Sequence, residues 1–260
     1  MSWASRRRTT YLSGVILFFV VVIGVPIAYW YFSIPATCFD GIQNEGETSV
    51  DRGGPCLLLD EHALQPYAIL WARSFHVRDG SYNSVAYIQN PNQGAGVVAA
   101  QYKFGLYDAQ NVLIAERDGV AAIMPGAITP IFEPDIDTGN RIVAHTYFEF
   151  TAPLSWERMT NAALPISINN KQMTNTATAP ELTATVANSS VADVIGPAFV
   201  AVVFDSAGNA FAASATRLDR ISAGASSQLV FTWPDPFTTQ FGQIDIIPVV
   251  APIAAPTPRQ

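Results

Sequence analysis

The chain has 260 residues, enough for one large or two small domains, and 49% of them are hydrophobic, which excludes a generally disordered chain. Only 13% are charged, and the formal net charge is −7. The basic cluster Arg6-Arg7-Arg8 is followed by a chain in which acids outnumber bases, which argues against a nucleic-acid partner because phosphate binding needs clustered Lys and Arg.

An apolar stretch near the start predicts a membrane anchor. No charged residue occurs between Arg8 and Asp40, and the segment 11–32 is long enough to cross a hydrocarbon core, which takes ~20 residues as a helix. Tyr29-Trp30-Tyr31 suits the headgroup boundary, and Pro26 predicts a kink. The arginines in the stub 1–10 predict a cytoplasmic N-terminus, so the protein is expected to be single-pass in the cell membrane with the rest of the chain outside.

A cleaved signal peptide is the alternative for this stretch. Such peptides share the basic start, but their apolar cores usually run ~7–15 residues and end in small residues. Here the apolar stretch is longer and ends in bulky aromatic residues, which favours an anchor that is not cleaved.

The two cysteines of the chain, Cys38 and Cys56, bracket an acidic, Gly-rich stretch. Outside the cytoplasm two thiols are expected to pair. A disulfide around a loop this short adds roughly 3 kcal/mol of stability in the loop-entropy model. We therefore expect residues 33–60 to form a disulfide-clipped acidic spacer between the membrane and the first domain.

The stretch from Cys38 to Cys56 resembles a short cysteine-rich motif of bacterial surface proteins, C-x-D-G-I-x-N-x-x-E-x-x-x-D-C-G-G-x-C. Arg52 stands where that motif has a further cysteine, which makes pairing of Cys38 with Cys56 the simplest arrangement. The positions that match the motif between the two cysteines are Asp40-Gly41-Ile42, Asn44, Glu47, Asp51 and Gly53-Gly54.

This spacer also offers a hypothesis for calcium. Carboxylate and amide oxygens are the ligands that Ca²⁺ takes, although the spacing here is not that of an EF-hand. The alternative is a solvated acidic spacer that binds no ion. The candidate calcium ligands are Asp40, Asn44, Glu45, Glu47 and Asp51.

Beyond Cys56 the pattern is that of an all-β protein, with short alternating runs separated by Asn, Gly, Pro and Asp. Tyr102, Phe104 and Leu106 alternate and predict one buried face of a strand. The run 198–204 is nearly all apolar, which predicts a strand buried on both sides. The best candidate for a further helix is 153–164, a short stretch in the expected link between domains.

An internal repeat at a nearly constant offset predicts two tandem domains, of a normal size for immunoglobulin-like β-sandwiches, over 61–160 and 161–247. The tail 248–260 is rich in Pro and Ala and is expected to be extended chain. The aligned pairs are 85–90 with 183–188, 106–108 with 203–205, 125–126 with 223–224, and 131–132 with 230–231.

The residues Phe104-Gly105-Leu106-Tyr107-Asp108 resemble the signature of the FxLYD family of bacterial extracytoplasmic β-sandwich domains. In the second repeat the signature is degraded to Ala201-Val202-Val203-Phe204-Asp205. The resemblance covers most of both repeats. It implies an immunoglobulin-like sandwich at a cell surface or envelope, and it supplies no catalytic residues because the family has none in common.

Asp108 and Asp205 each end a predicted strand, where a carboxylate can accept backbone N–H groups and start a turn, so we expect a structural role for both. Asn90 and Asn188 also suit turns, and Asn188 begins a formal glycosylation sequon.

No motif for catalysis is found. His62, His76 and His145 are scattered, and the sequence has no G-x-S-x-G, H-E-x-x-H, P-loop or Rossmann fingerprint. We therefore expect no catalytic residues and no enzymatic activity, with a hydrolase built on an unrecognised carboxylate pair as one alternative.

Together these features predict an all-β protein in which two tandem Ig-like sandwiches follow a single N-terminal transmembrane helix. The expected function is that of a membrane-anchored, extracytoplasmic interaction or scaffolding protein of the bacterial envelope, with an envelope protein as its partner, no nucleic acid and no cofactor. The alternative is a surface module that binds calcium or glycan.

Overall fold

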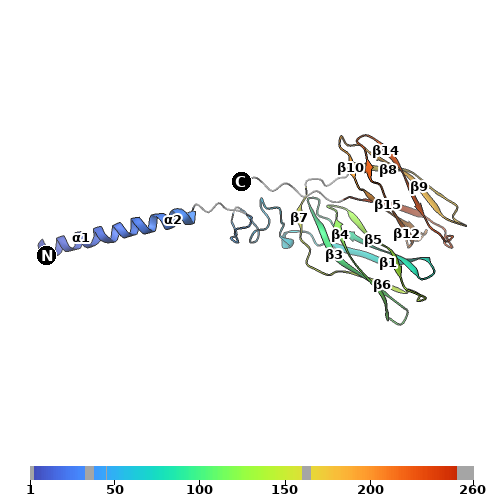
Figure 1. The fold of residues 1–260 in the computed structure, drawn as a ribbon, viewed down its shortest axis with the longest axis horizontal. Helices are drawn as coiled ribbons and strands as arrows, with labels where there is room; N and C mark the ends of the chain where they lie inside the picture. Colours follow the sequence, from blue (N-terminus) through green and yellow to red (C-terminus); the bar gives the residue numbers. More distant parts are fainter. Residues whose placement is uncertain (1–2, 33–37, 45, 160–164, 251–260) are drawn as a thin grey trace.

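The computed structural model describes residues 3–32, 38–44, 46–159 and 165–250. Three helical segments open the chain and follow one another without a loop: α1 (Trp3–Phe19), the π-helical turn η1 (Val20–Gly24) and α2 (Val25–Phe32). Figure 1 shows them as one rod that extends away from the β-sheets. Pro26 has no N–H to donate four residues back, which accounts for the change of hydrogen-bond pattern just before it.

Large apolar side chains along this rod are exposed. Ile16, Leu17 and Phe18 are 59%, 63% and 61% exposed, and the pattern continues through Ile27. Taken one at a time, the helices in the described part of the chain are not long and apolar enough for any of them to span a membrane.

The first β unit, called unit 1, covers the described residues from 57 to 159 and contains two antiparallel sheets, a three-stranded one with the order β1-β2-β5 and a four-stranded one whose main strands have the order β4-β3-β6. A short strand, β7 (Glu157–Arg158), pairs with the start of β3, and a 3₁₀ turn, η2 (Glu61–Ala63), precedes β1. The six main strands are β1 (Ala68–Arg78), β2 (Ser81–Gln89), β3 (Ala95–Tyr107), β4 (Leu113–Ile123), β5 (Ile128–Asp137) and β6 (His145–Phe150).

The core of unit 1 lies between these sheets. Ile88 and Ile131 come from one sheet, and Phe104 and Leu106 from the other; all four are 0–2% exposed. Tyr102, Phe104 and Leu106 are buried on the same face of β3, so the alternation in the sequence is confirmed.

The second unit, called unit 2, covers residues 165–249 and repeats this arrangement. Its two main sheets have the orders β8-β9-β14 and β12-β11-β15, and β10 (Val194–Ile195) pairs with β13 (Arg220–Ile221) in a small third sheet. The main strands are β8 (Ile166–Thr174), β9 (Glu181–Asn188), β11 (Ala198–Phe204), β12 (Ala210–Arg217), β14 (Ser226–Thr232) and β15 (Gln243–Val249).

The strand order is the same in both units. Numbered within each unit, the first, second and fifth main strands form one sheet, and the fourth, third and sixth form the other. The internal repeat in the sequence therefore has a structural counterpart, and the described residues beyond the N-terminal helices form β-sheets with one short 3₁₀ turn, which agrees with the predicted all-β class.

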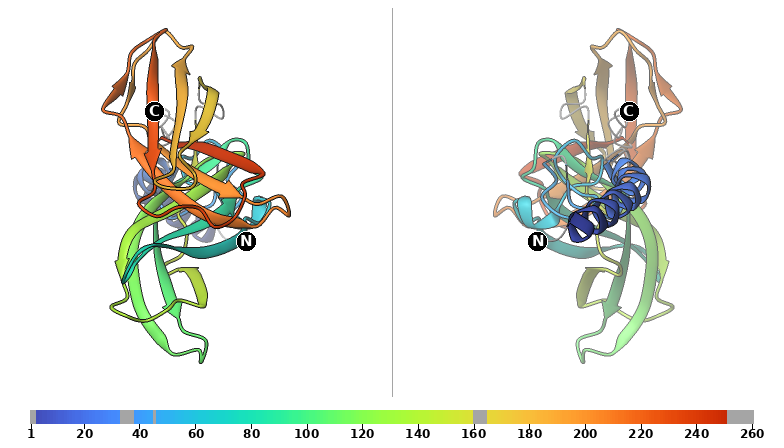
Figure 2. Two further views of the ribbon diagram at one scale, coloured as in Figure 1. Left: turned by 90° about the vertical axis from the view of Figure 1, so that its right-hand side faces the viewer. Right: turned by 90° about the vertical axis from the view of Figure 1, so that its left-hand side faces the viewer.

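The two units pack against each other through a third apolar cluster. Val85 and Tyr87 of β2 meet Val200 and Val202 of β11, and Val85 and Val202 are fully buried. Figures 1 and 2 show the units side by side, with β1 and β5 next to β12 and β15. We call this cluster the inter-unit interface. It is completed by Phe75, Ala210 and Ala213, with Trp71, Phe132, Phe204, Ile247 and Val249 partly buried around it.

The inter-unit interface explains the nearly unbroken apolar run of β11. Phe199, Ala201 and Val203 face the core of unit 2, and Val200 and Val202 face unit 1. The prediction of a strand buried on both sides is confirmed.

One boundary prediction needs correction. The stretch 153–164, the best candidate for a further helix, is not helical where it is described, because Leu154 and Trp156 pack against the core and Glu157 enters β7; residues 160–164 lie outside the described part. The tail does not begin at residue 248, because Pro248 and Val249 pair with β11. Proline is tolerated there because β15 is an edge strand.

Candidate functional site

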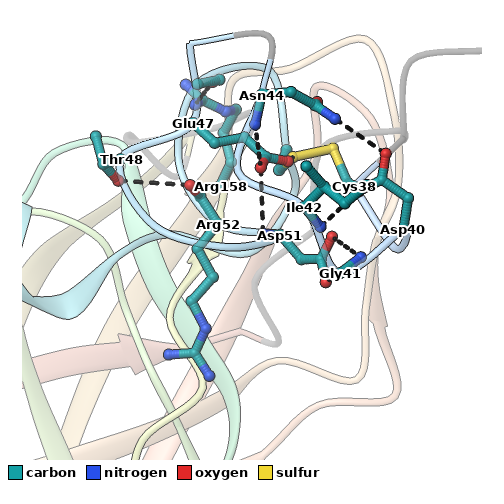
Figure 3. The surroundings of a disulfide bond; sticks show 12 residues. Cys38, Asp40, Gly41, Ile42, Asn44, Glu47, Thr48, Asp51, Arg52 and Arg158 are labelled. Atoms are coloured by element: carbon teal, nitrogen blue, oxygen red, sulfur yellow. Dashed lines mark hydrogen bonds between the residues drawn. A yellow bond between two sulfur atoms is a disulfide. The ribbon is translucent and has the colours of Figure 1, made fainter. Parts of the chain in front are cut away.

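The cysteine segment is a folded loop fixed to unit 1. A disulfide joins Cys38 to Cys56, as predicted, and Cys56 is fully buried. Arg158 of β7 donates from its backbone N–H to Leu57 O (2.8 Å) and from Nη2 to Gly54 O (2.7 Å). We call residues 38–56 the cysteine loop, and Figure 3 shows it beside Arg158. The predicted disulfide clip is therefore confirmed, and the second half of the loop is also held to unit 1 by hydrogen bonds.

Glu47 is the centre of the cysteine loop. Its side chain is buried, and its Oε2 atom accepts the backbone N–H groups of Asn44 and Asp51, each at 3.2 Å. Its Oε1 atom lies 3.1 Å from Sγ of Cys56. The carboxylate thus ties two turns of the loop to each other next to the disulfide, as Figure 3 shows.

The two aspartates of the loop, Asp40 and Asp51, act in the same way. Oδ1 of Asp40 accepts the N–H of Ile42 at 2.8 Å, and its Oδ2 accepts Nδ2 of Asn44 at 3.0 Å. Asp51 accepts the N–H of Gly41 at 3.1 Å. A short segment with few apolar residues is thereby ordered through polar contacts and one disulfide.

The candidate calcium ligands all lie in this loop. The oxygen atoms of those that the structure describes do not converge on one centre. Among the described residues, Cys38, Glu47 and Cys56 are the one group of three side chains close enough to hold a metal, and the two sulfur atoms are already bonded to each other. Oδ1 of Asn44 is buried without a hydrogen-bond partner. Glu45 lies outside the described residues.

Asp108 and Asp205 occupy equivalent turns at the ends of β3 and β11. Oδ1 of Asp108 accepts the N–H groups of Gln110 (3.0 Å) and Val112 (2.9 Å). Oδ1 of Asp205 accepts those of Ala207 (2.9 Å) and Asn209 (2.8 Å). These backbone hydrogen bonds hold the pKa of both carboxyls below the usual value, and the charge of Arg141 adds to the effect at Asp108. This is the turn geometry that the sequence predicts.

Asn90 and Asn188 are also equivalent, at the ends of β2 and β9, and both are 1% exposed. Nδ2 of Asn90 donates to the carbonyls of Ala95 (2.7 Å) and Met124 (2.9 Å). Nδ2 of Asn188 donates to the carbonyls of residues 192, 221 and 222. The sequon at Asn188 is therefore not accessible to glycosylation in the folded chain. The amide nitrogen that would carry the sugar is buried, and its hydrogen atoms are already engaged in hydrogen bonds.

A groove of about 610 Å³ opens where the two units meet. We call it the inter-unit groove. It is lined by residues 72–76 of β1, residues 143–147 at the start of β6, and Ala210 and Phe211 of β12. It brings together His76 and His145, which are far apart in the sequence, and adds Arg73, whose Nη1 donates to Ala210 O at 3.1 Å. No spacing rule in the sequence indicates this site, because Arg73 and His76 come from β1 and His145 comes from β6, two strands of different sheets.

A smaller hollow of about 250 Å³ lies on the outer face of sheet β4-β3-β6. Tyr107 and Tyr147 meet edge to face there, with ring centroids 5.1 Å apart. Glu116 and Glu149 line the same hollow, and Lys103, which pairs with Glu116 at 3.4 Å, lies beside them. The hydrogen bond to Glu116 raises the pKa of Lys103 above its usual value, so the ammonium stays charged and offsets the carboxylates.

Comparisons with known proteins leave the family open. No family model and no curated protein matches the chain. Among solved structures, red sea bream transglutaminase is similar over 70% of this chain and 31% of its own, with 10% identity and a TM-score of 0.24. The yeast delta-COP-I mu-homology domain is similar over 67% of this chain and 76% of its own, with 10% identity and a TM-score of 0.23. A Bacteroides uniformis beta-glucuronidase is similar over 68% of this chain and 22% of its own, with 11% identity and a TM-score of 0.20.

Proposed function

We propose that this chain is a membrane-anchored, extracytoplasmic interaction or scaffolding protein, and that it carries no catalytic site. The observation that carries the proposal is the combination of an exposed apolar helical rod with a disulfide-bonded loop and two β units fused by a buried interface. Such a molecule, anchored by the rod, presents the surfaces of its two joined β units outside the membrane.

The anchor is proposed for residues 11–32. These residues lie in consecutive helical segments, carry no charged side chain, and expose large apolar groups such as Leu17 and Phe18. A continuous apolar surface of this kind is covered by lipid or by another protein. Arg6-Arg7-Arg8 at one end favours the orientation with the N-terminus in the cytoplasm, and the disulfide suits an oxidising compartment outside it.

The units are proposed to be Ig-like sandwiches of the FxLYD type. In each, the first, second and fifth strands face a sheet with the order fourth, third, sixth, which is compatible with an immunoglobulin-like arrangement that lacks its last strand. Each signature position in unit 1 has a physical role. Phe104 and Leu106 fill the core, Tyr107 lies over the space left by Gly105, and Asp108 forms the turn.

The first test is crosslinking of the tagged, full-length chain in native membranes, followed by identification of the captured proteins. We expect a reproducible set of envelope proteins. The control is a chain in which residues 11–32 are replaced by an unrelated transmembrane helix, which should capture the same set if the β units bind the partner. Recovery of the chain alone would contradict the scaffold function, and release of the chain from membranes by alkaline carbonate would contradict the anchor.

A calcium-binding function is the second candidate, because Oδ1 of Asn44 is buried without a partner in a loop rich in carboxylates. A ligand that binds the folded state raises its melting temperature. A rise at millimolar calcium that is lost in Asn44→Ala would favour this function. No rise at that concentration would remove it.

A further inference from the structure

The small hollow on the outer face of sheet β4-β3-β6 is open to solvent. β3 lies in the middle of this sheet, and the register places Glu116 of β4 and Tyr147 of β6 on either side of Gly105. Sheet β1-β2-β5 packs against unit 2 through β2, so the outer face of the opposite sheet points away from unit 2. Tyr147 is 61% exposed there. We call this site the tyrosine hollow, and it is lined chiefly by Lys103, Gly105, Tyr107, Glu116, Tyr147 and Glu149.

Gly105 gives the tyrosine hollow its shape. A glycine inside a strand often marks a place where another group approaches the backbone closely. Here that group is the ring of Tyr107, whose Cε2 atom lies 2.9 Å from the position that a β-carbon at residue 105 would take. Tyr147 meets this ring at an interplanar angle of 84°, with the centroids 5.1 Å apart. Two rings at a right angle form a corner in which a cation can lie within ~6 Å of both centroids, the range of cation–π attraction.

The charges around the tyrosine hollow are mostly negative. Lys103 lies opposite Asp118 of β4 and Glu149 of β6 in the register. It pairs with Glu116 at 3.4 Å, and this hydrogen bond, followed by the charges of all three carboxylates, raises the pKa of Lys103. The side chain of Glu149 makes no hydrogen bond or ion pair with another residue in the described ranges. One ammonium thus faces three carboxylates, and the hollow attracts a second cation.

The size and chemistry of the tyrosine hollow favour one arginine side chain. Its volume of about 250 Å³ is below the ~300–1,000 Å³ of pockets that hold drug-sized ligands, so it suits the end of a single side chain. A guanidinium group is planar, stacks on aromatic faces and pairs with a carboxylate through two parallel hydrogen bonds. The ammonium of lysine is a point charge without a flat face. Tyrosine and arginine are also enriched among the residues that dominate binding between proteins.

We propose that the tyrosine hollow binds an arginine side chain of a partner protein. The guanidinium lies in the corner between the rings of Tyr107 and Tyr147 and pairs with the carboxylate of Glu149. This rests on the proposed scaffolding function and gives it a contact site and a recognised side chain. A partner that covers the hollow also removes water from it, which strengthens both the cation–π contact and the ion pair.

The test uses short Gly/Ser peptides that differ in one central residue, which is arginine, citrulline, lysine or glutamate. The peptides are immobilised at high density, and binding of the full-length chain in an uncharged polyoxyethylene detergent is measured by surface plasmon resonance. We expect the arginine peptide to bind best. Citrulline has the shape of arginine without its charge and should bind about tenfold more weakly. Lysine should bind more weakly than arginine because it cannot stack as a plane, and glutamate should not bind.

Four variants of the chain assign the binding to the tyrosine hollow. Glu149→Gln should weaken binding of the arginine peptide about tenfold, whereas the matched control Glu61→Gln, at an exposed position in η2, should leave it unchanged. Lys103→Gln should strengthen binding, because it removes the competing ammonium and frees Glu116. Gly105→Ala displaces the ring that lies over residue 105 and should weaken binding. An unchanged melting temperature in each variant shows that the fold is kept.

Three outcomes would overturn the proposal. Equal binding of the arginine and citrulline peptides would show that the hollow does not recognise a positive charge. Equal binding of the lysine and arginine peptides would exclude recognition of a guanidinium. Weaker binding by Lys103→Gln would identify an occupant that needs the ammonium, such as an anion. Each of these results leaves the scaffold function in place, which fails only if the membrane crosslinking recovers no partner.

Discussion

Tyr87 lies in the inter-unit interface with its hydroxyl buried and without a hydrogen-bond partner. Its ring stacks near Trp71, with centroids 4.3 Å apart, and burial raises the pKa of its phenol above the usual value. An unpaired buried hydroxyl costs free energy, so Tyr87→Phe should raise the free energy of unfolding by about 1 kcal/mol. Urea unfolding followed by Trp fluorescence measures the change.

The matched control is Tyr82→Phe. The hydroxyl of Tyr82 accepts the N–H of Val143 at 3.4 Å, so its removal takes away a partner and should lower stability slightly. A loss of stability in Tyr87→Phe equal to that in Tyr82→Phe would show that the Tyr87 hydroxyl is satisfied in solution.

Asp205 makes the stability of unit 2 depend on pH. Backbone N–H groups, first that of Asn209, hold its pKa below the usual value of about 3.9. Because the folded state has the lower pKa, the stabilisation is complete above the unfolded value and is lost as the pH falls through the folded value. Asp205→Asn keeps an acceptor oxygen but cannot titrate. The free energy of unfolding of this variant should therefore fall less between pH 5 and pH 2.5 than that of the natural chain. If the two proteins lose the same free energy of unfolding over this pH range, Asp205 does not have this role.

At the scale of elements, the disulfide stabilises the cysteine loop against local unfolding more than it stabilises the strands. Replacing both cysteines with Ser removes a loop closure worth about 3 kcal/mol in the loop-entropy model. We expect the amide of Gly53, which donates to Leu58 O at 2.8 Å, to exchange with solvent roughly 100-fold faster. Amides of β3 should exchange at unchanged rates. Faster exchange in both places would mean that the loop stabilises unit 1 as a whole.

Strands β3 and β11 could be predicted from sequence, since the alternation in one and the apolar run in the other are local signals. Tyr102, Phe104 and Leu106 mark the buried face of β3, and the repeat anticipates the shared strand order. The docking of the cysteine loop could not be predicted, because it depends on Arg158, about a hundred positions away in the chain. The apolar run of β11 indicates two buried faces, but not that one of them covers the other unit.

The inter-unit groove could not be predicted from the sequence either. His76 and His145 carry no motif, and which strands lie at the edge of a sheet is a property of the sheet rather than of the strand. β6 itself alternates strictly in burial, with His145, Tyr147 and Glu149 exposed, yet periodicity alone does not tell an edge strand from a central one.

At the scale of the whole molecule, the inter-unit interface joins unit 1 and unit 2, so we expect them to behave as one cooperative unit. Val202 is fully buried between the units and lies against residues of β2. Separating the units would expose this cluster to water, so unit 1 and unit 2 should unfold in a single transition when the full-length chain is heated in detergent. Calorimetric and van't Hoff enthalpies of equal size would demonstrate this.

Val202→Asp should uncouple the units, because it buries an unpaired charge in their interface at a cost of about 3–5 kcal/mol. We expect two transitions for this variant, with unit 2 melting first because β11 belongs to it. Val230→Asp is the matched control, since Val230 is 42% exposed on the outer face of β14, away from the interface, and it should keep one transition near the original temperature. Two transitions in the natural chain would mean that the units move independently. In that case residues of β12 would not stay beside β1 and β6, and the inter-unit groove would lose its third wall.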